Sequence, residues 1–319
     1  MRRRGSPWTG IGAVLFKETA DHFSGWLVWI IVALLFLTAF AAAYAAINTI
    51  RQTIGESPFL FLRLLTLRQD QFRWSFIDLV GILVPLMAIA LGFDAVGGEF
   101  SRRTMSRILA QPIYRDALIL GKFLAGLLTL GICLVALWLL VIGFGLVLLG
   151  VPPGGAETVR MLGFLVATIA YGGVWLAVAM LFSVLFRAPA PAFIAAAALW
   201  LVFLLFWNAD IAPLVATLFA GPPQDIFGPR LAYIDAVQAL TRLSPHTLYG
   251  EIALALLHPS TRALGLVFLS QLQGAILGAP LPTLESFLLI WPQLAGLVAG
   301  MIAIFAIAYV AFQRQEIRA

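Results

Sequence analysis

Long apolar runs, separated by short polar segments, make up most of this sequence. A helix needs about 20 apolar residues to cross a hydrocarbon core of about 30 Å. Runs that reach or approach this length cover residues 26–47, 77–93, 123–150, 161–186, 191–207 and 286–312. They are continuous rather than alternating, which favours helical spans over barrel strands. The pattern therefore predicts an all-α, polytopic membrane protein with one transmembrane domain over residues 1–319.

The composition agrees with this assignment. Hydrophobic residues make up 62% of the chain and charged residues 11%, whereas soluble domains are about half apolar and about a quarter charged. The net charge of +5 comes from arginines in short loops between apolar runs, which is typical of topology signals rather than of nucleic-acid binding. Cys133 is the single cysteine and lies within an apolar run. We therefore expect neither a disulfide framework nor a thiolate metal cluster.

The lysines and arginines also predict the orientation. Six spans place both termini on the same side of the membrane, and 12 of the 20 lysines and arginines fall on that side. Positive residues accumulate on the cytoplasmic side. We expect a multi-pass protein of the inner, cytoplasmic membrane with both termini in the cytoplasm.

Residues 8–23, before the first span, read as an amphipathic helix at the membrane interface. Its apolar face at 100° per residue consists of Trp8, Ile11, Leu15 and Thr19. Lys17 and Asp21 lie opposite, while Val14 and Glu18 interrupt the pattern. The alternative is that this helix continues the first span into the cytoplasm.

Residues 208–285, before the last span, are too many for a structureless loop. They contain turn signals and then a helical stretch, so we expect extracellular helices here. Residues 263–277 are apolar but short for a span, and they carry Gln271 and Gln273. We expect a helix that is external or half-inserted. If it crossed the membrane, the C-terminus would move outside.

The segment from Phe93 to Lys122 is a charged island between two apolar runs. A helical wheel over residues 95–112 places a polar arc on one side, formed by Glu99, Arg102, Arg103, Ser106, Arg107 and Ala110. The opposite side carries Phe100, Thr104, Met105, Ile108 and Leu109. Pro112 ends the pattern. We expect a cytoplasmic amphipathic helix that contacts the membrane surface or a partner. A solvated positive loop also explains the arginines, but not the two faces.

Catalytic patterns are weak in this chain. The histidines His22, His246 and His258 form no i,i+4 pair, so no zinc motif of that type is present. Gly121-Lys122 resembles the end of a phosphate-binding loop, but Phe123 follows it and Asp116 stands where the first glycine is needed. The middles of the six runs carry no charge, which argues against ion coupling within the chain. We expect no catalytic, metal or cofactor site.

Several short motifs resemble the permease subunits of type 2 ABC exporters, the ABC-2 family. An apolar run ends in FDAVGGE, and ILAQPIYRDALILGKFLAG opens the next long run. The matching positions are Gly98, Glu99, Leu109, Gln111, Pro112, Ile113, Arg115, Gly121 and Lys122. RLSPHTLYGEIALALL is similar to a later family element through Leu243, Pro245 and Tyr249, and AYVAFQRQEIR resembles the basic cytoplasmic tail.

Within this family, the similarity is strongest to the branch of the permease that serves nitrous-oxide reductase maturation. That branch has a YDAI-GE form at the end of the second span. Two features differ here. Ser101-Arg102-Arg103-Thr104 replaces the usual ERGT, and the 208–285 region is longer than in that branch.

The resemblance implies a mechanism and partners. Residues 95–112 would be the coupling helix that docks on a separate ATP-binding subunit, and residues 8–23 the connecting helix that flanks it. The interface residues would be Glu99, Arg102, Arg103, Ser106, Arg107, Gln111 and Arg115, with Trp8, Lys17 and Glu18 on the connecting helix. Two permeases, most simply a homodimer, and two ATP-binding subunits would form the unit. ATP and Mg would bind in the partner.

The leading hypothesis is therefore a permease that exports a hydrophobic or amphipathic substrate by alternating access. A stand-alone secondary transporter or channel is the first alternative, and the uncharged run interiors argue against it. An intramembrane enzyme is the second, and the lack of clustered His, Glu or Asp argues against that. The pattern leaves the transported substrate open.

Overall fold

Long helices form the core of the computed structural model. It describes residues 10–52, 59–67, 75–105, 107, 114–222, 224–225, 228–229, 231–262, 264 and 280–315. Six helices in this part of the chain are long and apolar enough to cross a membrane. They are α2 (Trp26–Gln52), α4 (Phe76–Gly92), α7 (Arg115–Leu149), α8 (Gly155–Phe186), the continuous α9–η1–α10 (Pro189–Ala220) and α14 (Thr283–Arg314). The prediction of six helical spans is confirmed.

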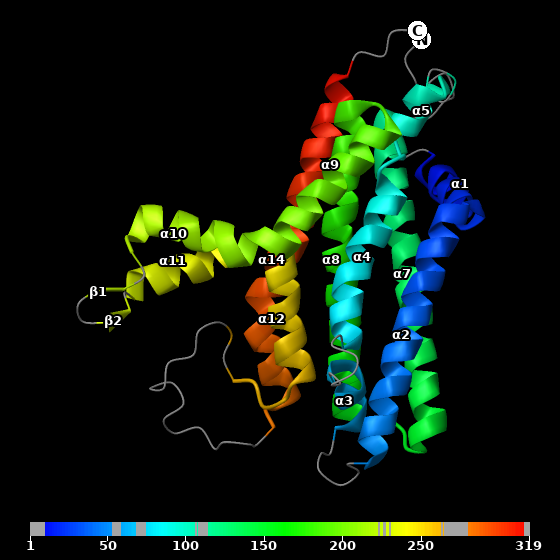
Figure 1. Cartoon of the computed structure of the whole chain (residues 1–319). Helices are drawn as coiled ribbons and strands as arrows, with labels where there is room; N and C mark the ends of the chain where they lie inside the picture. The colour runs from blue at the N-terminus through cyan, green and yellow to red at the C-terminus, as the bar shows by residue number, and fades with distance from the viewer. Residues whose placement is uncertain are drawn as a thin grey trace.

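The remaining elements are short. They are α1 (Ile11–Ser24), α3 (Leu60–Thr66), α5 (Gly97–Ser101), α11 (Leu231–Thr241), α12 (Pro245–Leu257) and a two-residue hairpin of β1 (Gln224–Asp225) with β2 (Gly228–Pro229). Helix α1 and the C-terminal end of α14 lie at the same end of the bundle as α5 (Figure 1). We call this the terminal end, and the end near α3 the distal end.

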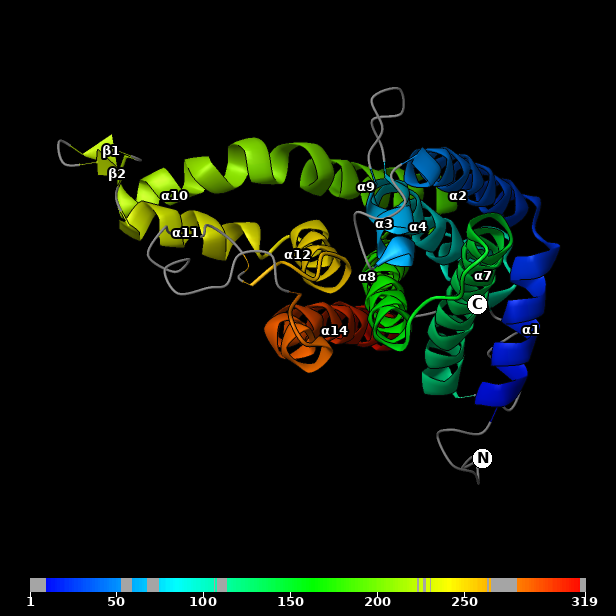
Figure 2. The ribbon, with the colours of Figure 1, turned by 90° about the horizontal axis from the view of Figure 1, so that it is seen from below.

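Helix α8 is the centre of the bundle. It packs against α4, α7, α12 and α14 (Figures 1 and 2). Its fully buried side chains include Tyr171 and Trp175, and the Tyr171 ring stacks on Tyr249 of α12 with centroids 4.5 Å apart. Large aromatic side chains contribute much of the area that a core buries. A displacement of α8 would therefore change its contacts with most helices of the bundle.

The fifth span is longer than the sequence pattern predicted. The apolar run was expected to end at residue 207, but the helix continues through the π-helical η1 (Val202–Ile211) into α10 (Ala212–Ala220). Pro213 lies just after the π-helical residues, inside the continuous helix, where it removes one backbone hydrogen bond. Trp207 donates from Nε1 to the Leu240 carbonyl of α11 at 3.0 Å. The α10–α11 pair extends sideways from the bundle (Figure 1).

Helix α12 belongs to the bundle rather than to a separate external layer. It packs against α8, α14 and α4, with Tyr249, Ile252 and Leu256 buried. The expectation that residues 208–285 form external helices stays a prediction, because packing against the bundle does not place α12 relative to a membrane. Residues 265–277 of the predicted half-inserted segment lie outside the described residues.

A buried arginine holds the distal end of α12. Arg160 of α8 is 1% exposed. Its Nη1 donates to the Leu256 carbonyl at 3.2 Å and to Ser286 Oγ at 2.9 Å, and its Nη2 donates to the Leu281 carbonyl at 2.5 Å. Leu256 is in the last turn of α12, where carbonyls lack helical partners and the helix dipole is negative. Arg160 thus joins α8, α12 and the start of α14.

Candidate functional site

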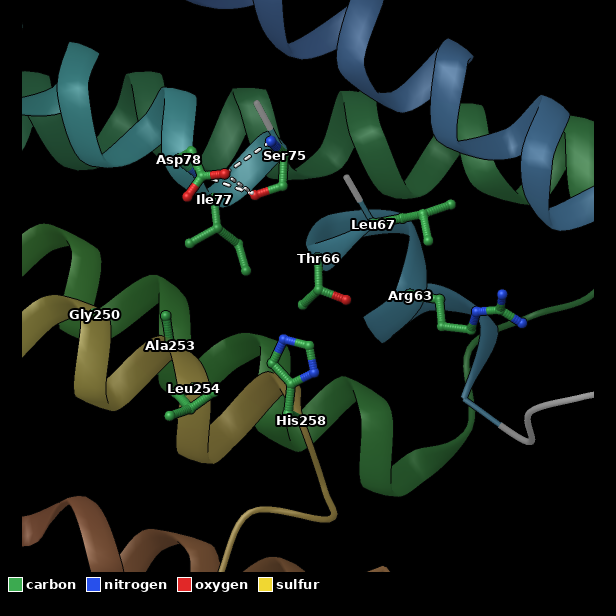
Figure 3. A pocket seen from close by; sticks show the side chains of 10 residues that line it. All are labelled: Arg63, Thr66, Leu67, Ser75, Ile77, Asp78, Gly250, Ala253, Leu254 and His258. Atoms are coloured by element: carbon green, nitrogen blue, oxygen red, sulfur yellow. Dashed lines mark hydrogen bonds between the residues drawn. The ribbon is translucent and has the colours of Figure 1, made fainter. Parts of the chain in front are cut away.

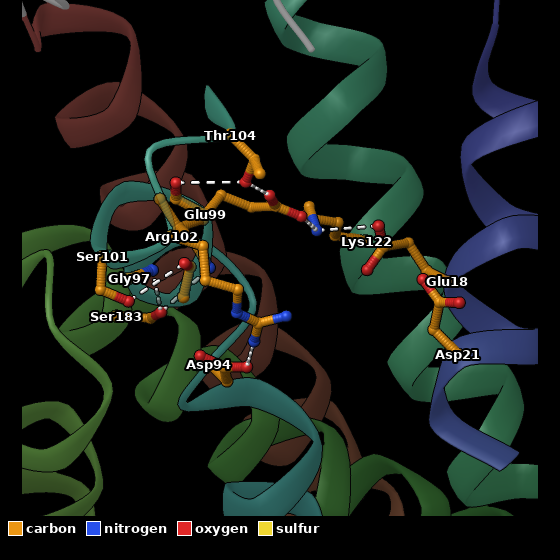
Figure 4. Close-up of polar contacts among 12 residues, drawn as sticks. Glu18, Asp21, Asp94, Gly97, Glu99, Ser101, Arg102, Thr104, Lys122 and Ser183 are labelled. Atoms are coloured by element: carbon orange, nitrogen blue, oxygen red, sulfur yellow. Dashed lines mark hydrogen bonds and ion pairs between the residues drawn. The ribbon is translucent and has the colours of Figure 1, made fainter. Parts of the chain in front are cut away.

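A charged cavity of about 490 Å³ lies at the terminal end, where α1, α2, α4, α5 and α7 meet. Its charged and titratable lining groups are Glu18, Asp21, His22, Asp94, Glu99, Arg102 and Lys122. Figure 4 shows Glu18, Lys122 and Glu99 directed toward one another from three helices, and Arg102 directed toward Asp94. The cavity borders α5, and α5 is part of the segment predicted to be the coupling helix.

Lys122 is the buried cation at the centre of this site. Its side chain is 3% exposed, and its Nζ lies 2.8 Å from Glu18 Oε1 and 3.5 Å from Glu99 Oε1 (Figure 4). Glu18 is on α1, Lys122 on α7 and Glu99 on α5. An ammonium group has three donors, so one lysine can serve two carboxylates. We call Glu18, Lys122 and Glu99 the buried triad.

The preceding residue explains how α1 comes close enough to form the triad. A Cβ on Gly121 would lie only 2.8 Å from Cγ1 of Val14 on α1. Real Cβ atoms do not approach other atoms this closely, so a glycine here lets the two helices touch. The GK pair of the sequence thus has two parts: Gly121 admits Val14, and Lys122 binds Glu18.

Helix α5 is anchored from below by α8. The backbone N–H groups of Val96 and Gly97 donate to Ser183 Oγ at 3.0 and 2.9 Å. These are N-terminal amides of a short helix, which have no helical acceptor. A Cβ on Gly97 would meet the Ala188 backbone nitrogen at 3.0 Å, so the glycine lets α5 rest on the α8–α9 turn. No pattern in the sequence marked Ser183 for this contact.

The predicted single helix over residues 95–112 is wrong where the structure describes it. Helix α5 ends at Ser101, and Arg102 and Arg103 form a turn. Arg103 has φ 56°, which a right-handed helix excludes for a residue with a side chain. The wheel that joined Glu99 with Arg102 and Arg103 on one face therefore does not apply. Glu99 faces Lys122 inside, whereas Arg102 and Arg103 are exposed.

The other predicted interface residues fall into separate places. Arg107 is exposed and Met105 buried. Arg102 pairs with Asp94 at the cavity wall (Figure 4). Arg115 donates to the Gln315 carbonyl at 3.2 Å and so ties α7 to the end of α14. Ser106 and Gln111, with Trp8 of the connecting helix, lie outside the described residues.

Helix α1 uses a different face from the one predicted. Val14 and Glu18, which interrupted the apolar pattern, are its buried residues, and His22 one turn further on approaches Thr129 of α7 at 3.1 Å. This stripe packs on α7 because Glu18 finds a cation there. Lys17 stays exposed and contacts Glu18 at 3.0 Å.

The electrostatics of α1 follow from this packing. Burial by itself would raise the pKa of Glu18, but the ammonium of Lys122, and then that of Lys17, hold the pKa below its ordinary value. Burial lowers the pKa of His22, which keeps the imidazole neutral beside the two lysines. Glu18 is therefore held in its ionised form, with a neutral histidine one turn away on α1.

A second cavity of about 650 Å³ lies at the distal end between α3, α4 and α12. Thr66, Asp78 and His258 are among the side chains that line it (Figure 3). Asp78 accepts from the Ser75 backbone at 2.9 Å and from its hydroxyl at 2.8 Å, which caps α4. Asp78 therefore has a structural task at the start of a span.

The described residues contain no group of three or more His, Cys, Asp or Glu side chains that could hold a metal ion. The charged groups of the terminal-end site instead connect helices to one another. It joins three helices through charge pairs and leaves arginines on the outside.

Comparison with known proteins identifies the family. The profile of ABC-2 family transporter proteins matches residues 13–317, nearly the whole chain. The chain belongs to the ABC-2 transporter family. The match includes all three residues of the buried triad and all six spans. The resemblance inferred from the short motifs is confirmed.

Two curated relatives carry the same printed name, probable ABC transporter permease protein NosY. The one from Stutzerimonas stutzeri is 29% identical over 231 residues, which cover 70% of this chain and 76% of the relative. The one from Pseudomonas aeruginosa is 32% identical over 188 residues, which cover 57% of this chain and 62% of the relative. The aligned part thus spans less than two thirds of the second relative.

Family membership fixes the general role of this ABC-2 chain. It is a multi-pass membrane permease of an ABC transporter, a transport protein rather than an enzyme. A permease of this family works with an ATP-binding partner subunit. The charged terminal-end site is our candidate for the docking place of such a partner.

Proposed function

We propose that this chain is the permease of an ATP-driven exporter and receives mechanical force at α5 and the turn that follows it. The arrangement of α5 supports the proposal. Its inner side is fixed by Ser183 and Lys122, while the outer side presents arginines. A partner that pushes on this segment would act directly on α7 and α8, because both contact α5 through buried groups.

The docking surface would be the exposed arginines Arg102, Arg103 and Arg107, with Arg187 beside them over the Phe100 ring at 5.4 Å. Their common charge favours an acidic groove on the ATP-binding subunit. Glu99 would not touch the partner, since it faces Lys122. Arg102 would contribute from the edge because it is also paired with Asp94.

The full unit would contain two permeases, in the simplest case identical, and two ATP-binding subunits. ATP and Mg would bind in those subunits, and this chain would need no cofactor. The docking end, with both termini, would face the cytoplasm across the inner membrane. Alternating access between the permeases would export a hydrophobic or amphipathic substrate, in keeping with the apolar span interiors.

The test is to co-express the chain with its ATP-binding subunit and to measure co-purification and ATP hydrolysis. Arg103→Glu with Arg107→Glu should weaken binding at least about tenfold, which corresponds to about 1.4 kcal/mol, because two like charges would face the acidic groove. Arg262→Glu is the matched control, since Arg262 is an exposed arginine that follows α12.

Unchanged co-purification and hydrolysis in the double variant would contradict docking at this surface. A stand-alone secondary transporter or channel remains the alternative function. It would transport in vesicles that contain this chain alone, without an ATP-binding subunit, and it would respond to an ion gradient.

A further inference from the structure

Helices α1 and α5 rest on different parts of the bundle. Helix α1 packs on α7, whereas α5 rests on α8 and α9. The cavity of about 490 Å³ separates them, with α1 residues on one wall and α5 residues on another. Among the described residues, Lys122 contacts acidic groups of both helices. The two peripheral helices therefore meet through one ammonium group.

The burial of this ammonium makes the contact strong. A buried lysine is costly unless it is paired, and a buried carboxylate that loses its cation is left uncompensated. Lys17 can compensate Glu18 in part from the surface, at 3.0 Å. Glu99 has Lys122 and the Thr104 hydroxyl as partners. Separation of α5 from Lys122 would therefore leave Glu99 without a cation at that site.

The cavity leaves space for α1 and α5 to move relative to one another. Close-packed interiors resist small shifts, whereas a cavity that can hold water leaves space for a helix to move. Arg102 and Glu99 on the α5 side could approach Asp21 and His22 on the α1 side without displacing packed side chains. Lys122 holds one acidic group of each helix and so opposes such a relative motion.

We propose that Lys122 is a positioning residue that makes α1 and α5 move as one unit. The part of this inference that concerns ATP rests on the proposed function: a push on α5 would reach α1 through the triad. The part that concerns the two helices does not depend on a partner. The substitution Lys122→Met would leave both helices in place but uncouple their motions.

The first experiment uses the full-length permease alone. Cysteines replace the exposed Ala20 on α1 and Ser101 on α5 in a Cys133→Ser background, and spin labels report the distance between them. The labelled protein that keeps Lys122 should give one narrow distance distribution, and the labelled Lys122→Met protein should give a broad one. Lys122→Arg keeps the charge and should restore most of the narrow distribution. Arg314→Met, which removes an exposed cation at the same end, should change nothing.

The second experiment uses the complex with the ATP-binding subunit. Lys122→Met should reduce the permease-dependent stimulation of ATP hydrolysis about tenfold, within the usual range of coupling between sites, while co-purification stays intact. Lys122→Arg should recover most of the stimulation. If no ATP-binding subunit associates even with the unsubstituted chain, the proposed function fails, and the distance measurement still decides the role of Lys122.

Folding of the variant is controlled separately. If Lys122→Met does not give a monodisperse protein, Glu99→Gln replaces it, because this change releases α5 and keeps the Glu18–Lys122 pair. A narrow distance distribution in a folded Lys122→Met or Glu99→Gln protein would overturn the inference. So would a broad distribution in Lys122→Arg equal to that of Lys122→Met, because the effect would then not follow the charge.

Discussion

Two buried cations at opposite ends of the bundle are held in different ways. Lys122 at the terminal end is held by two carboxylates from two other helices. Arg160 at the distal end is held by backbone carbonyls and the Ser286 hydroxyl. Charge pairs respond to protons and to the movement of either partner. Carbonyls and a hydroxyl do not titrate near neutral pH, so the contacts of Arg160 do not respond to protons. One end is therefore adjustable and the other is a fixed clamp.

The largest effect is expected at the fixed clamp. Arg160→Met leaves the carbonyls of Leu256 and Leu281 and the Ser286 hydroxyl buried without their donor. Each orphaned group costs about 1–3 kcal/mol, so we expect unfolding to become easier by about 3 kcal/mol or more.

Chemical or thermal denaturation of the purified protein measures this change. Arg160→Lys is the matched control, because it keeps the charge but offers a single nitrogen and should lose less. An equal loss in both variants would mean that the fork geometry matters more than the charge. No loss in either would remove the distinction between the two ends.

A smaller effect is expected where α1 touches α7. Gly121→Ala places a Cβ only 2.8 Å from Cγ1 of Val14. Overpacking of this kind costs about 1–3 kcal/mol. It should also widen the Ala20–Ser101 label distance, because α1 carries Glu18 away from Lys122.

The size of the Val14 side chain tests this explanation. Val14→Ala should restore both stability and distance in the Gly121→Ala protein. Gly131→Ala on the same helix should be tolerated, since its Cβ would find its nearest neighbour only at 3.9 Å. A failure of Val14→Ala to restore either property would contradict a steric cause.

The smallest effect is expected from acid. The folded-state pKa of Glu18 lies below its ordinary value of 4.5, so its contribution to stability is complete above that pH. The contribution is lost as the pH falls through the lower, folded pKa. We expect the melting temperature of Glu18→Gln to depend less on pH than that of the unsubstituted protein between about pH 6 and pH 3. Arg160→Lys should keep the unsubstituted slope, since carbonyls do not titrate there. An unchanged slope in Glu18→Gln would show that the low pKa of Glu18 does not contribute to the stability of the protein.

The sequence was a good guide to the long helices and a poor guide to their ends. Continuous apolar runs located all six spans, because only a helix satisfies its own backbone in lipid. The start of α8 at Gly155 was missed, because Glu157 and Arg160 precede the apolar run and suggested a loop. Lys122 and Arg160 are helical residues whose partners come from other elements, which a single-chain hydropathy pattern does not reveal.

The candidate site could be predicted only in part. The GGE and GK motifs were visible, and Glu99 and Lys122 proved to be neighbours. A wheel presumes one uninterrupted helix, and the left-handed Arg103 breaks that condition. For α1, Glu18 was treated as an irregularity in an apolar face. Its burial depends on a lysine more than a hundred positions away, and long-range pairing of that kind leaves no local periodicity.

Ser183 and Arg160 lie near opposite ends of α8, and each holds a different helix of the bundle. Ser183 holds the N-terminal amides of α5, and Arg160 on the same uninterrupted helix holds the end of α12. At 1.5 Å per residue they lie about 35 Å apart along the axis of α8, roughly the thickness of the hydrocarbon core. A helix resists compression along its axis, so we expect α8 to shift as one rigid element. We therefore expect an axial displacement of α8 at Ser183 to reach Arg160 at the other end of the helix.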